Sequence, residues 1–146
     1  MKKLKQIEKL QEIKELRRKL AELEVAKAMG VYRDAEIALQ RALQAEADLE
    51  QEGESRTKKR LGSLMNQPGN VRIQSARVVN VYRQIENEKD LARNHTQSRT
   101  VVLEESTQNL RTQREKLARY LQVEERTRKL CGNLKAKESA EMLRKS

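Results

Sequence analysis

Residues 61–70 read LGSLMNQPGN and contain Pro68, the only proline among the 146 residues of the chain. The same stretch holds Gly62 and Gly69, two of the five glycines. A proline inside a helix removes a hydrogen bond and clashes with the preceding turn. This breaker lies near the midpoint of the chain, and long polar sequence typical of helix runs on either side of it. The stretch therefore predicts two long helices joined by one short loop.

The composition also favours long helices over a thick globular core. Ala, Glu, Lys, Arg and Leu together exceed half of the residues, a fraction typical of coiled coils. Tryptophan and phenylalanine are absent, although aromatic side chains dominate burial in compact cores. Intrinsic disorder is the competing interpretation, because 37% of the residues are charged. We expect helices, since apolar residues recur at helical spacing.

The first half of the chain carries two apolar stripes at helical spacing. The first stripe consists of Leu10, Ile13, Leu16, Leu20 and Leu23. The second stripe follows a phase shift at Gly30 and is mostly alanine: Val31, Ala35, Ala38, Ala42, Ala45 and Leu49. Both stripes are expected to bury against the second half of the chain. Alanine contributes little buried area, so contact along the second stripe is expected to be weak.

The second half is more sparsely apolar. Its first cluster consists of Val78, Val81, Tyr82 and Ile85. Residues 93–100 contain no apolar side chain, and the next leucines recur at seven-residue spacing at Leu103, Leu110 and Leu117. Asparagine is a favoured N-cap, so we expect Asn70 to cap the start of the second helix.

These patterns predict an all-α protein in which two long helices form one antiparallel coiled-coil hairpin over residues 1–146. The expected elements are a helix over about residues 3–62, a loop over about 63–70 and a helix over about 71–143. A single continuous helix that dimerises is the alternative, and Pro68 argues against it. With the turn centred near residue 67, residue i is expected to face residue 134 − i to within a few residues.

The formal net charge of +10 is unevenly distributed. Residues 1–19 carry a net charge of +5 and residues 111–137 carry +6, whereas residues 34–54 carry −6. Folding back would bring the two basic segments to the same end of the hairpin. Such an end is expected to meet an acidic surface, a phosphate backbone or an anionic membrane.

No residues suggest catalysis, a cofactor or a metal site. His95 is the only histidine and lies near no cysteine or aspartate cluster, whereas a metal site needs several ligands. Cys131 is the only cysteine, which excludes an internal disulfide and is typical of a reducing compartment. No apolar run approaches the roughly 18 residues that span a bilayer, and the start MKKLKQIEKL lacks the apolar region of a secretory signal. We expect a cytoplasmic protein that is not an enzyme and does not insert into membranes.

Basic and tyrosine residues suggest two further binding modes. The basic run RTKKR at 56–60 could contact phosphates, but no aromatic residues are interleaved with it, so nucleic acid is not the expected partner. Tyr32, Tyr82 and Tyr120 either anchor a partner or fill positions between the helices. A generic coiled-coil scaffold or a basic hairpin that binds nucleic acid remains the alternative function.

Three stretches carry a family resemblance: KKLKQIEKLQEIKELRRKL (2–20), YRDAEIALQRALQAEADLEQ (32–51) and the break NQPGN (66–70). With its length, low cysteine content and two-helix pattern, the chain resembles the YscO/FliJ stalk proteins of type III secretion and flagellar export. The resemblance implies a central stalk whose terminal end enters the pore of a hexameric export ATPase. It also implies contact with the cytoplasmic domain of the export gate, at the cytoplasmic face of the inner membrane, and for some members with secretion chaperones.

Charge placement supplies candidate contact residues within this resemblance. The candidates for the ATPase are Lys2, Lys3, Lys5, Arg17, Arg18, Arg126, Arg128 and Lys129. The candidates for the export gate or another partner are Tyr32, Tyr82, Arg56, Lys58, Lys59 and Arg60.

Overall fold

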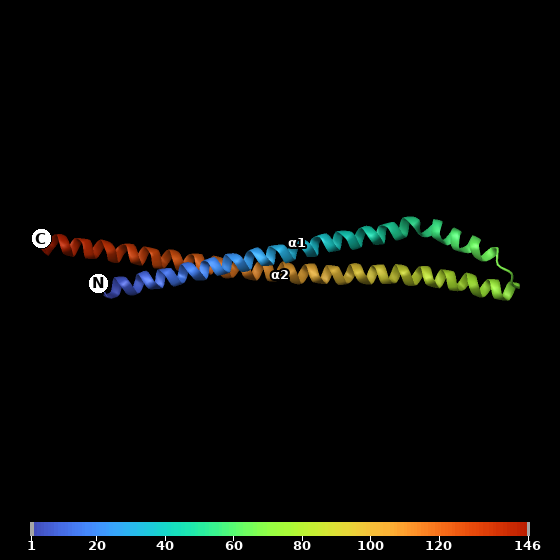
Figure 1. Ribbon diagram of the computed structural model, residues 1–146, viewed down its shortest axis with the longest axis horizontal. Helices are drawn as coiled ribbons and strands as arrows, with labels where there is room; N and C mark the ends of the chain where they lie inside the picture. The colour runs from blue at the N-terminus through green and yellow to red at the C-terminus, as the bar shows by residue number, and fades with distance from the viewer. Residues whose placement is uncertain (1, 146) are drawn as a thin grey trace. The chain divides into compact units, whose positions relative to one another are not determined.

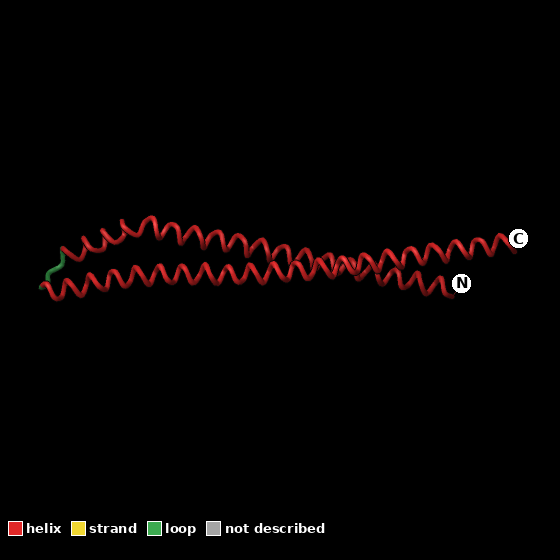
Figure 2. The backbone as a smooth tube through the Cα atoms, turned by 180° about the vertical axis from the view of Figure 1, so that it is seen from behind, coloured by secondary structure: helices red, strands yellow, loops and turns green. Residues whose placement is uncertain are grey.

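The computed structural model describes residues 2–145 and contains two helices, α1 (Lys2–Met65) and α2 (Val71–Lys145) (Figure 1). Helix occupies the described chain on both sides of one short loop at residues 66–70 (Figure 2). The two helices pack against each other, which confirms the predicted all-α helical hairpin. α1 extends three residues beyond its expected end, so the loop is shorter than expected.

Three hydrogen bonds hold the loop and the helix ends beside it. The backbone N–H of Gln67 bonds to the carbonyl oxygen of Leu64 at 3.1 Å and closes the last turn of α1. Asn70 then caps α2, because its Oδ1 accepts a hydrogen bond from the backbone N–H of Ile73 at 2.9 Å. Pro68 lies between these two ends, and its carbonyl oxygen accepts a bond from Arg77 Nη1 at 3.3 Å. The expected N-cap is confirmed.

Contacts between the helices group into two compact units. The terminal unit comprises the described residues 2–32 of α1 and 106–145 of α2. The loop unit comprises residues 33–105, including the loop itself.

In the terminal unit the two helices meet along a seam with coiled-coil spacing. The inward positions of α1 are less than 36% exposed and alternate in steps of three and four residues: Leu4, Ile7, Gln11, Lys14, Arg18, Ala21, Val25, Ala28 and Tyr32. The most deeply buried positions of α2 are Ser106, Leu110, Glu124, Thr127 and Cys131. This seam is narrow and mixes small, polar and charged residues.

The first leucine stripe does not belong to this seam, so its predicted burial against the second half was wrong. The side chains of Leu10, Ile13, Leu16, Leu20 and Leu23 are 41–61% exposed. Periodicity had identified a face of the helix, but the face that contacts α2 is the neighbouring series that ends with Val25, Ala28 and Tyr32. α1 runs through Gly30 as regular helix. The phase shift expected there arises because the two apolar stripes lie on different faces of this helix.

The pairing register also differs from the prediction. Arg18 pairs with Glu124, Glu8 with Lys135 and Met29 with Arg114, so residue i of the terminal unit faces about 143 − i rather than 134 − i. The expected register would have placed Arg18 opposite Lys116, a like charge that costs free energy. The observed alignment brings opposite charges together in two of these three contacts.

The loop unit buries mainly small side chains. Ala35 and Ala42 of α1 and Val81 and Ile85 of α2 are at most 8% exposed, so part of the alanine stripe is inward as predicted. The polar run 93–100 also has half-buried positions, Thr96 and Thr100. Their hydroxyls donate to the carbonyl oxygens of Ala92 and Thr96 at 3.0 and 2.9 Å, so each is satisfied within its own helix.

Replacing one seam leucine and one outer leucine tests the assignment of faces. Leu110→Ala should lower the free energy of unfolding by about 2–3 kcal/mol, because Leu110 is 6% exposed. Leu20→Ala should change it by no more than about 0.5 kcal/mol, because Leu20 is 61% exposed. Urea unfolding followed by circular dichroism measures both. Equal losses for the two variants would contradict the observed orientation of α1.

Gly30 offers a stabilising substitution. It lies inside α1, is exposed, and a Cβ built there meets no atom within 4 Å. Gly30→Ala should therefore raise the free energy of unfolding by about 1 kcal/mol, the difference in helix propensity. Gly69→Ala is the matched control. It lies in the loop, and its Cβ would come within 3.4 Å of Arg77 Nη1 and Ile73 Cγ2, so no gain is expected. A melting temperature unchanged by Gly30→Ala would contradict the prediction.

Candidate functional site: a basic terminal unit

The terminal unit carries the whole net charge of the protein. Residues 1–32 and 106–146 hold twenty Lys and Arg against ten Glu, which gives +10. The loop unit holds twelve Lys and Arg against twelve Asp and Glu, which gives zero. Both basic segments of the sequence thus belong to one compact unit, and they make its surface strongly attractive to anions.

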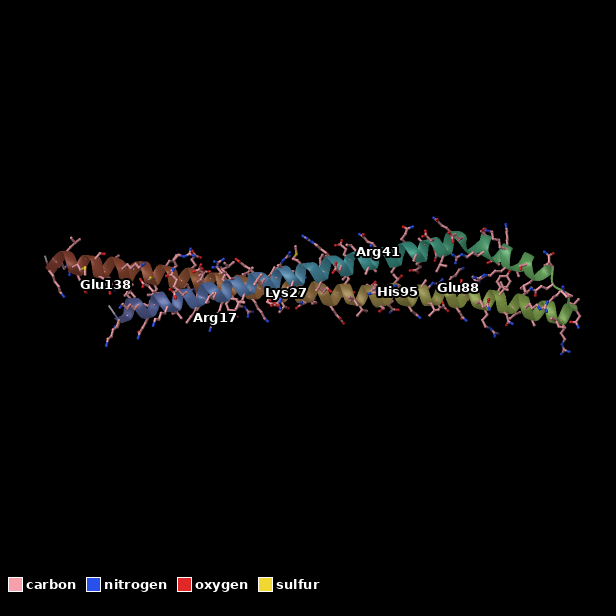
Figure 3. All side chains as sticks on the ribbon, in the orientation of Figure 1. Arg17, Lys27, Arg41, Glu88, His95 and Glu138 are labelled. Carbon is pink, nitrogen blue, oxygen red and sulfur yellow. The ribbon has the colours of Figure 1, made fainter. Side chains whose placement is uncertain are left out.

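Seven of the eight candidate ATPase contacts are exposed side chains of this unit, and six of these seven form no ion pair with the buried Glu124. These six are Lys2, Lys3, Lys5 and Arg17 on α1, and Arg126 and Lys129 on α2. Charged side chains project outward along both helices, as seen for Arg17 (Figure 3). Lys129 pairs only with Glu125 of its own helix, at 3.5 Å, and both side chains remain at least 66% exposed. Such a pair contributes little to stability and leaves the cation accessible.

The other two candidates, Arg18 and Arg128, serve a buried carboxylate. Glu124 on α2 is 6% exposed at its side chain, and its Oε2 lies 2.6 Å from Arg18 Nε on α1. Its Oε1 lies 3.4 Å from Arg128 Nη2. Arg18 also donates to Glu22 Oε1 at 2.8 Å. Arg18 therefore joins the two helices at Glu124, whereas Arg128 pairs with the same carboxylate within α2 and keeps a side chain that is 66% exposed.

The hydrogen bond with Glu22 is the main reason why the pKa of Arg18 lies above its ordinary value. Desolvation opposes this increase, and the negative charge of Glu124 adds to it. Arg18 is therefore a permanent cation between two carboxylates, one on each helix. Arg18, Glu124 and Arg128 line a shallow open hollow together with Leu121 and Glu125.

Sequence reasoning missed the role of Glu124, although a signal was present. The leucines at 103, 110 and 117 recur every seven residues, and continuing that series reaches Glu124 and then Cys131. Both are buried, so the series marks the seam beyond the last leucine. A charged residue at a buried seam position requires a partner of opposite charge. The spacing along α2 does not identify that partner, because only the pairing register places Arg18 opposite Glu124.

The second candidate set is divided between the two units. Tyr32 belongs to the terminal unit and is half-buried in its seam, whereas the other five residues belong to the loop unit. Arg56 pairs with Glu52 at 3.0 Å within α1, and Arg60 pairs with Glu88 across the unit at 3.0 Å. The accessible members that make no ion pair within residues 2–145 are Tyr82, which is 52% exposed, and the exposed Lys58 and Lys59, whereas Arg56 is exposed but paired.

Residues with catalytic or ligand potential are dispersed. His95 is exposed, and Cys131 is 3% exposed within the seam. Over residues 2–145 no three His, Cys, Asp or Glu side chains gather in an arrangement that could hold a metal ion. Neither described helix contains a stretch long and apolar enough to cross a bilayer. The feature that distinguishes the terminal unit is its charge.

Comparisons with protein-family models, with curated proteins and with solved structures found no match.

Removing the buried carboxylate should destabilise the terminal unit. In Glu124→Ala, Arg18 and Arg128 lose their shared counter-ion, so the melting temperature should fall. Glu125→Ala is the control, because Glu125 is 66% exposed and its ion pair with Lys129 lies within α2, so it should melt close to the wild type. The double variant Arg18→Ala/Glu124→Ala should lose less than the two single variants combined. Additive losses would show that the pair is not coupled.

Proposed function

We propose that this protein is a non-enzymatic central stalk of a type III secretion export apparatus. In this proposal the terminal unit inserts into the hexameric export ATPase, and the loop unit reaches toward the cytoplasmic domain of the export gate. The protein would act at the cytoplasmic face of the inner membrane. The observation that carries the proposal is the confinement of the net charge of +10 to the terminal unit.

Electrostatic contact suits a stalk inside a ring. Exposed cations on both helices would attract an acidic pore over a distance comparable to the Debye length, about 8 Å at physiological salt. Such contacts do not require close complementarity of shape, so they tolerate rotation of one partner within the other. The candidate contacts are the exposed cations Lys2, Lys3, Lys5, Arg17, Arg126 and Lys129. Arg18 would contribute indirectly, because it joins the two helices at Glu124, whereas Arg128 pairs with Glu124 within α2 and stays exposed.

The neutral loop unit would make the second set of contacts. Its accessible candidates are Tyr82, Lys58 and Lys59, on both helices of that unit. Exposed tyrosine is favoured at protein interfaces because its ring is apolar and its hydroxyl is polar. In this proposal the loop unit binds the export gate or a secretion chaperone.

Mixing the protein with the export ATPase of the same organism tests the proposal. At a substoichiometric ratio the wild type should raise ATP turnover or promote hexamer formation. The charge-reversal variant Lys2→Glu/Lys3→Glu/Lys5→Glu should lose at least half of this effect, because it removes three exposed cations and adds three anions. The control Lys58→Glu/Lys59→Glu, in the loop unit, should retain the effect.

Two outcomes would overturn the proposal. One is an ATPase that neither turns over faster nor assembles in the presence of the wild type. The other is binding of DNA or RNA that weakens steeply with salt, without any effect on the ATPase. The second outcome would identify the terminal unit as a nucleic-acid-binding hairpin.

A further inference from the structure

The terminal unit exposes an apolar stripe that its own fold does not use. We call this row the outer stripe. Its five members lie on α1 and are Leu10, Ile13, Leu16, Leu20 and Leu23. The last three side chains are 59–61% exposed. Single exposed leucines are normal on protein surfaces, but a contiguous row on one helix marks an interaction site.

The spacing of the outer stripe matches a second coiled-coil seam. From Ile13 onward its members are separated by three, four and three residues, as are the inward residues of the same helix. Side chains with this spacing form a narrow row that fits the groove of one more helix. α1 therefore carries one seam filled by α2 and a second seam without a helix among the described residues.

The width of the stripe favours a helix over a membrane. Amphipathic helices that lie on bilayers present a broad apolar face, often with Trp or Phe. The outer stripe contains no aromatic residue, and charged residues lie directly beside it, including Glu12 and Arg17. Its chemistry suits contact with one narrow row of apolar side chains.

Charge indicates which helix would fit. The exposed ionic residues on and beside the stripe between positions 9 and 27 are four cations and two anions: Lys9, Glu12, Arg17, Lys19, Glu24 and Lys27. Arg17 and Lys27 are labelled in Figure 3. Lys27 pairs with Glu24 at 3.5 Å, whereas Lys9 and Arg17 make no ion pair within residues 2–145. A second copy would bring the same cations, and a second unit of charge +10, against the first.

From exposure, spacing and charge we infer that the outer stripe docks an amphipathic α-helix of another protein, whose apolar residues follow a heptad and are flanked by Asp or Glu. This inference concerns a lateral face of α1 and does not depend on the export ATPase. The partner's apolar row would cover Ile13, Leu16, Leu20 and Leu23, and its acidic flanks would face Lys9 and Arg17. Opposite charges beside a coiled-coil seam select the partner and its orientation.

The test uses the full chain and designed helical peptides with a fluorescent label. The acidic peptide carries leucine at heptad positions and glutamate beside them. One control peptide replaces each glutamate by lysine, and another is a scrambled acidic peptide without the heptad. Fluorescence anisotropy should show binding of the acidic heptad peptide and at least tenfold weaker binding of both controls.

Two protein variants locate the binding site. Leu16→Asn/Leu20→Asn should weaken binding at least tenfold, while its melting temperature stays close to that of the wild type because both side chains are exposed. Leu91→Asn, which changes a leucine of the loop unit that is 70% exposed, should bind like the wild type.

The inference is overturned if the acidic heptad peptide does not bind, or if it binds equally to the stripe variant. It is also overturned if the wild type instead binds vesicles of phosphatidylglycerol and phosphatidylcholine and the stripe variant does not, which would identify a membrane surface. Self-association of the wild type that is lost in the stripe variant, measured by analytical ultracentrifugation, would identify a second copy as the occupant.

Discussion

The ion pair between Arg18 and Glu124 is the most buried ionic contact between the two helices of the terminal unit, and it constrains how they align. Glu124 is buried, so its carboxylate needs a partner on the facing helix, and Arg18 supplies it at 2.6 Å. Sliding the helices by one turn would separate the pair and leave a carboxylate in the seam without a cation. Lys135 with Glu8, and Arg114 with Met29, follow the same alignment farther along the unit. Apolar packing alone would not impose it, because small, polar and charged side chains interrupt the apolar residues of the seam.

Small side chains also limit how firmly the helices are held. Within residues 2–145 no large side chain is less than 2% exposed. The inward residues include several alanines, and burying a methyl group contributes much less than burying a leucine. The hairpin is therefore stabilised by many weak contacts spread along its length. Proteins of this kind respond strongly to partners, because binding free energy adds directly to a modest stability.

Sequence patterns predicted the hairpin and the position of its turn, because these depend on local chemistry. Pro68 excludes a continuous helix and Asn70 caps the next one, and neither effect requires knowledge of the rest of the fold. The faces and the register could not be obtained in this way. The stripe at Leu16 and Leu20 is as regular as the true seam, and spacing alone does not reveal which of two apolar rows meets the other helix. The buried role of Glu124 likewise depends on a pairing between residues more than one hundred positions apart.

The inward threonines of the loop unit have a different consequence. Thr96 and Thr100 direct their hydroxyls to carbonyl oxygens of their own helix, so neither forms a directional bond with α1. In this part of the unit the two helices lie close together, but these threonines do not constrain the position of one helix along the axis of the other. The axial position of one helix along the other is instead constrained by ionic contacts such as that between Arg60 and Glu88. A change of register would thus break no cross-helix hydrogen bond of these two side chains, so resistance to axial displacement in this unit comes from contacts such as Arg60 with Glu88.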